Sequence, residues 1–425
     1  MSARSEIRLL DPLYGEIILA HPLADLLRAP VIQRLRDVRL SNIDSLVMPG
    51  ISNISRYEHA IGTTYLASRI GFYNRLGREE AWVLQASAML HDATITAFGH
   101  LVEEAFNYIS EQYDHETKMS LLLQRPNTYE LGGIDLQIYL GHEAGIREWA
   151  QKIFKADAEK YLVDIVNALK GEGRFGRCIA GDIDLDNLDN LVRIAFHMGL
   201  PVDRELPVRI AAEILGTDET GSTTFSEKSI TLIKQWLTLR WTVYEHLMLS
   251  RDDFIGKVML IYAIVLAYTR GELGLPEYAW TLSDRKLIEH LLQHKDSEIS
   301  RTVRAWLVHD LWPLADLLWM RGEPPSFART YGFADEATKA MGRPCFAYRI
   351  RDKRVRALKF QIESGEIIEL GDTPKQWLLG VASSKRQDFS AAANRRIRQL
   401  ACEFFETECI GRADERMPEA LSLFE

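Results

Sequence analysis

The chain has 425 residues, of which 47% are hydrophobic and 26% are charged. This is the composition of an ordinary globular protein, and it excludes a disordered chain, a collagen-like chain and a membrane-embedded protein. The chain has 51 lysine and arginine residues and 60 acidic residues, so its net charge is -9. This negative charge disfavours a protein whose whole surface attracts nucleic acid. The length predicts more than one structural unit.

Neither the cysteines nor the apolar segments indicate secretion or membrane insertion. The four cysteines are too scattered for a disulfide framework or a CxxC zinc module. The N-terminal segment lacks the apolar core of a signal peptide. The most apolar run, residues 258–268, has 11 residues, whereas a membrane-spanning helix needs about 20. We therefore expect a cytoplasmic protein without a membrane segment, in which this run is a buried helix.

The first 310 residues have apolar side chains mainly at helical spacing. Residues 32–40 place Ile32 and Leu35 on one stripe with arginines opposite, which predicts an amphipathic helix. Residues 81–90 are apolar on nearly every face, which predicts a central helix. Further apolar helix faces follow at 185–198, 236–249 and 258–268.

The pattern changes after residues 322–326, where glycine and two prolines mark a candidate boundary. Residues 346–370 alternate apolar and charged side chains around 363–366, which predicts a β-hairpin, and a helix containing Ile397 follows. The sequence thus predicts a mainly α protein, with a helical core over 1–320 and a smaller mixed α/β lobe over 321–425.

Histidines and aspartates at helix positions form the chemically informative pattern. His59 occurs in a helical segment, His91-Asp92 ends the apolar helix, and Asp186 opens a later one. Two imidazoles and two carboxylates suit a divalent metal such as iron, manganese, nickel, cobalt, zinc or magnesium. The ordered combination carries the prediction, because a single buried histidine is usually a hydrogen-bonded core residue.

Two features of the sequence compete with this interpretation. A second His-Asp dipeptide, His309-Asp310, has no matching partners around it. Asp182, Asp184 and Asp189 surround Asp186, so a neighbouring aspartate one turn away is an alternative ligand.

Several motifs together resemble the HD-domain phosphohydrolases, and within them the dNTP triphosphohydrolase branch. In chain order they are DPLYGEIIL near the N-terminus, QRLR at 33–36, PG at 49–50, RYEH at 56–59, LHD at 90–92, HE at 115–116, IDLDNLDNLVR at 183–193, HMGL at 197–200 and VYEH at 243–246. They cover about the first 305 residues in the order and spacing of that family.

The resemblance implies roles for individual residues. It implies that the catalytic metal is bound by His59, His91, Asp92 and Asp186. It implies that His100 protonates the leaving oxygen, with Glu103 orienting its ring. His115 and Glu116 match a second catalytic pair near the same pocket. Substrate contacts would come from Arg56 on a phosphate and Tyr244 on the nucleotide sugar.

The departures from the family pattern concern substrate recognition. Ile95 replaces a histidine that faces phosphate, and Asn187 and Asn190 replace an expected lysine and tyrosine. Leu40 replaces a glutamine that bonds the sugar 3'-hydroxyl, and Ile194 replaces its acidic partner. Since losing both polar partners leaves no unsatisfied group, we expect an apolar wall and a substrate that differs from an ordinary dNTP.

A basic run lies in the C-terminal lobe, at Arg349, Arg351, Lys353, Arg354, Arg356 and Lys359. It could hold a nucleotide effector or nucleic acid, but we expect a solvated strand face. The leading functional prediction is metal-dependent release of triphosphate from a (deoxy)nucleoside triphosphate. The alternatives are a nucleotidase or phosphatase on another small molecule, a single-strand nuclease, and a catalytically silent nucleotide-sensing scaffold. The resemblance also implies a homo-oligomer, at least a dimer.

Overall fold

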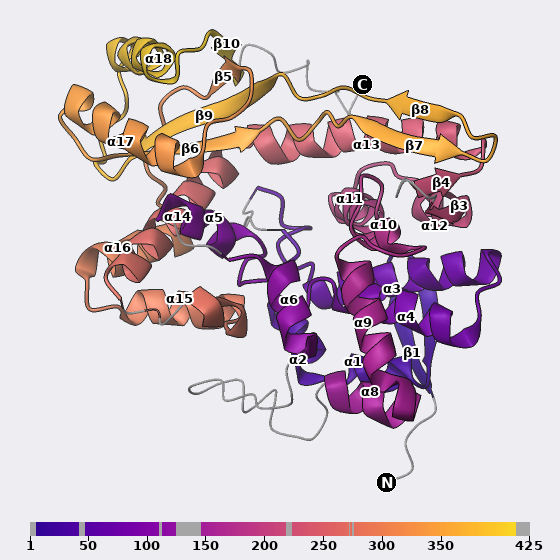
Figure 1. Cartoon of the computed structure of the whole chain (residues 1–425). Helices are drawn as coiled ribbons and strands as arrows, with labels where there is room; N and C mark the ends of the chain where they lie inside the picture. The colour runs from indigo at the N-terminus through magenta and orange to yellow at the C-terminus, as the bar shows by residue number, and fades with distance from the viewer. Residues whose placement is uncertain are drawn as a thin grey trace.

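The computed structural model describes residues 6–41, 47–109, 113–124, 146–217, 223–271, 273 and 276–413. These residues form a mainly α fold with three small sheets, as the sequence predicts (Figure 1). Among the described residues, none of the helices combines the length and the apolar composition that a membrane-spanning helix needs.

The N-terminal part contains a β-hairpin followed by two long helices. Its elements are β1 (Glu6–Asp11), β2 (Gly15–Ala20), α1 (Leu23–Leu27), α2 (Pro30–Gln33), η1 (Arg34–Asp37), α3 (Arg56–Tyr73) and α4 (Arg78–Leu90). Helix α4 contains the central helix predicted over 81–90, and the second half of α4 is buried. Helix α3 begins at a cap in which the Ser55 side chain accepts from the Glu58 backbone N–H.

The helix predicted over 32–40 is wrong beyond its first turns. Backbone hydrogen bonds from Leu40 to Ile54, and from Arg56 to Val38, hold residues 38–40 extended. Arg34 is buried and donates to the carbonyl oxygens of Ala93 and Ile95. A tertiary role for an arginine therefore replaces the solvated face expected from the pattern.

The middle of the chain adds further helices. They are α5 (Leu101–Tyr108), α6 (His115–Gln124), α8 (Ile146–Phe154), η2 (Lys155–Asp157), α9 (Ala158–Leu169), α10 (Gly176–Ile179), α11 (Leu185–His197) and α12 (Leu206–Ala212). A short strand pair, β3 (Ile214–Thr217) and β4 (Thr223–Phe225), follows. Helix α9 packs on α4, and α12 packs on α3. Helix α11 also packs against α3, which brings the two predicted ligand segments together.

The rest of the chain begins with long helices and ends with two sheets. The elements are α13 (Ser229–Leu249), α14 (Arg251–Thr269), η3 (Pro276–Thr281), α15 (Asp284–Gln293), α16 (Ser297–Leu307), β5 (Leu318–Arg321), α17 (Phe327–Met341), β6 (Cys345–Arg351), β7 (Leu358–Ile362), β8 (Ile367–Leu370), β9 (Gln376–Ser383), α18 (Ala391–Phe405) and β10 (Cys409–Arg412). The buried helix predicted at 258–268 lies within α14, and the helix containing Ile397 is α18.

The sheets connect segments that are distant in sequence. Besides the two-stranded sheet of β1 and β2, one four-stranded sheet has the order β10-β5-β9-β6 and another has the order β3-β4-β7-β8. Strands β7 and β8 form the predicted hairpin, with Leu358 opposite Leu370. The division predicted at residue 320 falls inside β5, and β7 pairs in parallel with β4 from the helical part. The two-domain division stays a prediction.

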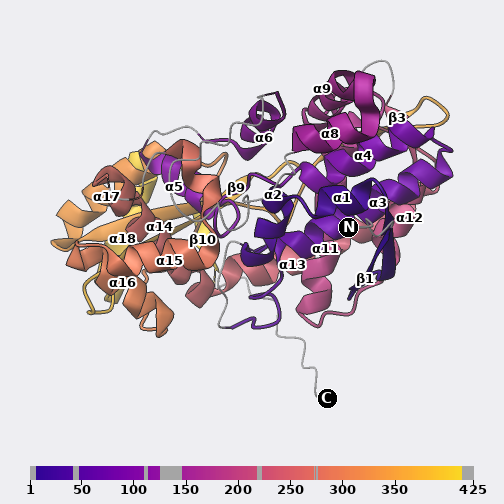
Figure 2. The ribbon, with the colours of Figure 1, turned by 90° about the horizontal axis from the view of Figure 1, so that it is seen from below.

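The helices gather in two groups (Figures 1 and 2). One contains α1–α4 and α8–α12, and the other contains α5 and α14–α18. Helix α13 and the chain through β6, β7, β8 and β9 run from one group to the other. Among the described residues, the first group surrounds one hydrophobic core, and the second contains two, one of them around α17 and α18. Helix α5, in the second group, begins with His100 at its N-cap.

The basic run is not a uniformly solvated strand face, in contrast to the sequence-based expectation. Arg354 is buried between the Trp241 and Trp319 rings, 4.6 Å from each ring centroid. Arg349 lies over the Phe327 ring, at 3.9 Å. The expectation fails because aromatic side chains distant in sequence cover these guanidinium groups.

Candidate functional site

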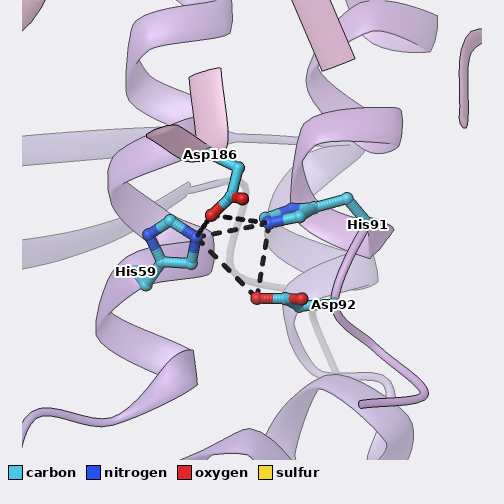
Figure 3. A group of neighbouring side chains, drawn as sticks. All are labelled: His59, His91, Asp92 and Asp186. Atoms are coloured by element: carbon cyan, nitrogen blue, oxygen red, sulfur yellow. Dashed lines mark hydrogen bonds and ion pairs between the residues drawn. The ribbon is translucent and has the colours of Figure 1, made fainter. Parts of the chain in front are cut away.

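Three helices bring the four predicted metal ligands together. His59 lies in the first turn of α3, His91 and Asp92 follow the last residue of α4, and Asp186 lies in the first turn of α11. Helix α3 packs against both α4 and α11, so the packing of the core fixes the separation of the side chains. Figure 3 shows the four side chains pointing toward one another.

The distances within this group are short. His59 Nε2 lies 3.0 Å from Asp186 Oδ1 and 3.2 Å from His91 Nε2. His91 Nε2 lies 3.4 Å from Asp92 Oδ2, and His59 Nε2 lies 3.8 Å from the same oxygen. One ligand atom from each of the four residues therefore falls within 4.8 Å of all the others.

The donor atoms fit a divalent cation. Two imidazole nitrogens face each other, and in the described part of the chain the closest partner of Asp186 Oδ1 is His59 Nε2, a contact that is an ion pair only while that histidine carries a proton. A cation between these atoms would satisfy both nitrogens and the carboxylate oxygen at once, and this mixed nitrogen and oxygen set is one that divalent first-row metals accept. The Asp186 side chain is 35% exposed, so the group is open on its side.

The outer nitrogens of both rings are held by other groups. His59 Nδ1 lies 2.7 Å from Asp189 Oδ2, and His91 Nδ1 lies 2.7 Å from the Ala88 carbonyl oxygen. Each Nε2 therefore faces the centre, which is the usual arrangement of metal-binding histidines. Because Asp189 contacts the outer nitrogen of His59, Asp186 is the aspartate of α11 that faces the centre, and its role as a metal ligand stays a prediction.

A buried charge network supports Asp189. Arg193 Nε and Nη2 donate to its two oxygens at 2.8 and 2.9 Å, and Arg193 Nη1 also donates to Asp11 and Glu58. The sequence analysis did not predict the contacts of Asp11 and Glu58 with Arg193. The spacing of Asp189 and Arg193 at i and i+4 is a sequence signal for the ion pair between those two residues alone. Burial raises the pKa of Asp189, but Arg193 and His59 lower it to about 2, so Asp189 is ionised.

Arg56 contacts a predicted ligand. Its Nη1 donates to Asp92 Oδ2 at 2.5 Å and its Nη2 donates to the Leu40 carbonyl oxygen at 3.1 Å. Burial alone would raise the pKa of Asp92, but Arg56 and His91 hold that pKa well below its ordinary value. Arg56 is only 3% exposed, and the contact with phosphate implied by the family resemblance stays a prediction.

A second group of titratable side chains lies beside the first. Glu103 joins two histidines, with Oε2 2.7 Å from His100 Nδ1 and Oε1 2.9 Å from His115 Nδ1. His115 Nε2 lies 3.7 Å from Asp92 Oδ1, which connects the two groups. Hydrogen bonds from the two histidines overcome burial and lower the pKa of Glu103 to about 2. Glu116 is exposed in the first turn of α6.

The predicted substrate residues occupy different environments. Asn187 donates to the Asp184 side chain at 2.8 Å, and the buried Asn190 Oδ1 has no hydrogen-bond partner. Tyr244 is partly buried, below the Arg240 guanidinium. Leu40 and Ile194 are buried in the same hydrophobic core. The dipeptide His309-Asp310 lies elsewhere, in ion pairs with Asp252 and Arg386.

Known proteins share this fold and parts of this sequence. The structure of a phosphohydrolase from Bacteroides thetaiotaomicron matches with a TM-score of 0.62 at 17% identity, over 89% of this chain and 100% of that one. The uncharacterized protein MJ1154 of Methanocaldococcus jannaschii is 24% identical over 66% of this chain and 54% of its own length. The metal-dependent phosphohydrolase cns2 of Cordyceps militaris is 26% identical over 32% of this chain and 38% of its own length.

The structural similarity identifies the fold. No protein-family model matches the chain. The chain spans about half the length of the archaeal relative that it matches, and less of the fungal one. It has the fold of a phosphohydrolase structure, together with a His/Asp group whose donor atoms suit a divalent metal.

Proposed function

We propose that this protein is a metal-dependent phosphohydrolase of the HD-domain type that acts on a nucleotide. The observation that carries the proposal is the convergence of His59, His91, Asp92 and Asp186 on one centre. The fold of the Bacteroides phosphohydrolase and the sequence similarity to a metal-dependent phosphohydrolase support it. The leading reaction is the release of triphosphate from a (deoxy)nucleoside triphosphate.

The four ligand side chains would hold one divalent ion, with Asp189 and Ala88 fixing the histidine rings. A bound ion of this kind polarises a phosphoryl oxygen and lowers the pKa of a bound water to supply a nucleophile near neutral pH. Arg56 keeps Asp92 ionised and oriented. Since the imidazoles must be neutral to bind a cation, ion binding would displace any proton carried by His59 or His91.

The His100–Glu103–His115 group would handle the proton of the leaving oxygen. The His100 side chain is 46% exposed, while its Nδ1 is held by Glu103, so its Nε2 is available to a substrate. Donation of a proton from His100 to the ester oxygen would make the nucleoside a neutral leaving group. Glu103 is shared with His115, so the carboxylate orients both rings.

Product analysis tests this proposal. The purified protein is incubated with each dNTP, NTP, nucleoside mono- and diphosphate in the presence of Mn²⁺, Mg²⁺ or Co²⁺, and the products are separated. We expect triphosphate and nucleoside from at least one substrate, and no product from Asp92→Ala. Asp310→Asn, in the second His-Asp dipeptide, is the matched control and should retain full activity. Orthophosphate alone would replace the leading reaction by a nucleotidase activity, and no product from any nucleotide would refute the proposal.

A further inference from the structure

The loop between β6 and β7, residues 352–357, lies along one side of α13. The Lys353 backbone N–H donates to Met248 Sδ at 3.3 Å, and Arg354 contacts the α13 residues Trp241 and Glu245. Arg354 also pairs with Asp352. These contacts attach a loop of the C-terminal segment to a helix that packs against α11.

Arg356 extends from this loop to the segment that precedes Asp186. Its Nη2 donates to the Gly181 carbonyl oxygen at 3.2 Å. The Gly181 backbone N–H in turn lies 3.4 Å from Asp184 Oδ2, and Asp184 caps α11 two residues before Asp186. Arg356 is partly exposed and has no carboxylate ion-pair partner in the part of the chain that the structure describes. A guanidinium group therefore contacts the segment that leads into the first turn of α11, which carries Asp186.

Arg240 places a second guanidinium group in the same region. It is 7% exposed, and it lies over the Tyr244 ring at 4.5 Å. Its Nε has no hydrogen-bond partner, and no carboxylate of the described segments pairs with it. Its helix, α13, packs against α11, and Leu237, one turn before Arg240, lies beside Gly371 together with the Arg356 carbonyl oxygen.

The other buried arginines near the centre are neutralised. Arg193 forms ion pairs with Asp189, Asp11 and Glu58, and Arg56 forms one with Asp92. Asp184 does not neutralise Arg240 or Arg356 by direct contact, because its oxygens accept from Gly181 and Asn187. Arg240 is buried, and a buried charge without a carboxylate partner is costly unless a ligand supplies one.

We propose that Arg240 and Arg356 bind a phosphoryl group of the substrate other than the one held at the metal. The substrate would therefore carry at least two phosphates, and these arginines would replace the phosphate-binding side chains that the sequence lacks at Ile95, Asn187 and Asn190. Guanidinium groups bind phosphate oxygens through paired N–H donors, which suits this role. The inference rests on the proposed function in taking the group at the metal as phosphoryl.

Binding of two inorganic anions tests this inference without requiring turnover. Tripolyphosphate and orthophosphate are titrated calorimetrically, as Mg²⁺ complexes in excess Mg²⁺, into wild type, Arg240→Gln and Arg356→Gln. Since a hydrogen bond to a charged group contributes about 1.5–3 kcal/mol, each variant should bind tripolyphosphate about 10- to 100-fold more weakly. Orthophosphate binding should not change, and Arg356→Lys should restore part of the lost affinity.

The control is Arg351→Gln, which removes an exposed arginine of β6 that pairs with Glu323 at 3.4 Å. It should bind both anions as wild type does. Equal weakening for both anions, no weakening for tripolyphosphate, or the same weakening in Arg351→Gln would overturn the inference. If Arg240→Gln does not fold, Arg356→Gln decides, because its side chain is on a loop. Selective weakening in a protein that hydrolyses no nucleotide would refute the proposed function alone.

Discussion

Replacing Asp189 by asparagine tests how the buried charge network supports the metal centre. Asp189 is fully buried and accepts from Arg193 Nε and Nη2, while its Oδ2 lies 2.7 Å from His59 Nδ1. The variant keeps the shape of the side chain but removes its charge. Two consequences should follow, one for stability and one for metal affinity.

The stability should fall because Arg193 loses its best partner. Breaking a buried ion pair from one side costs about 3–5 kcal/mol, and we expect a value near the lower limit because Arg193 keeps Asp11 and Glu58. Metal affinity should fall about 10- to 100-fold, as it does when other groups that orient metal-binding histidines are removed. His59 itself remains present, so binding should weaken without disappearing.

Two assays separate these effects. Urea unfolding of the metal-free protein gives the free energy of unfolding, and calorimetric titration with Mn²⁺ gives the affinity. Asp182→Asn is the matched control, because Asp182 is exposed two residues before the α11 cap. If Asp189→Asn matched the control in both assays, the role assigned to the network would be wrong.

Three further predictions follow from the same geometry. Glu103→Gln should lower the free energy of unfolding by about 3 kcal/mol above pH 4.5, because hydrogen bonds in the folded state lower the pKa of Glu103 to about 2. The difference from wild type should disappear as the pH falls toward about 2, and unfolding at a series of pH values measures it. Gly62→Ala should lower both stability and Mn²⁺ affinity, since a Cβ would overlap Asp189 Oδ1 and Arg193 Nη2, whereas Gly77→Ala, with open space around its Cβ, should keep its Mn²⁺ affinity. Chelation of the metal should lower the melting temperature of wild type but not of Asp92→Ala.

The sequence predicts the ligand-bearing helices because local patterns determine them. The apolar run before His91 marks a buried helix, and the apolar face at 185–198 marks another. The alternation around 363–366 likewise predicts the β7–β8 hairpin. Each of these signals lies within a few residues of the feature that it predicts.

The sequence does not predict contacts between distant segments. Arg34 lies in a pattern typical of a solvated helix face but is buried against backbone carbonyl oxygens of residues 93 and 95. Arg354 belongs to a basic run, yet two tryptophans from different elements enclose it. Only the tertiary fold shows that Asp189 supports His59 while Asp186 faces the centre.

The most direct test of the central claim is a titration of activity against bound metal. The metal-stripped protein receives increasing equivalents of Mn²⁺, and both the bound metal and the hydrolysis of its best nucleotide substrate are measured at each step. We expect activity to rise from zero in proportion to bound Mn²⁺ until one ion per chain is bound at the four-residue centre, and Asp186→Asn to bind less metal and show no turnover. Full activity in the stripped protein, or full activity in Asp186→Asn, would contradict the account.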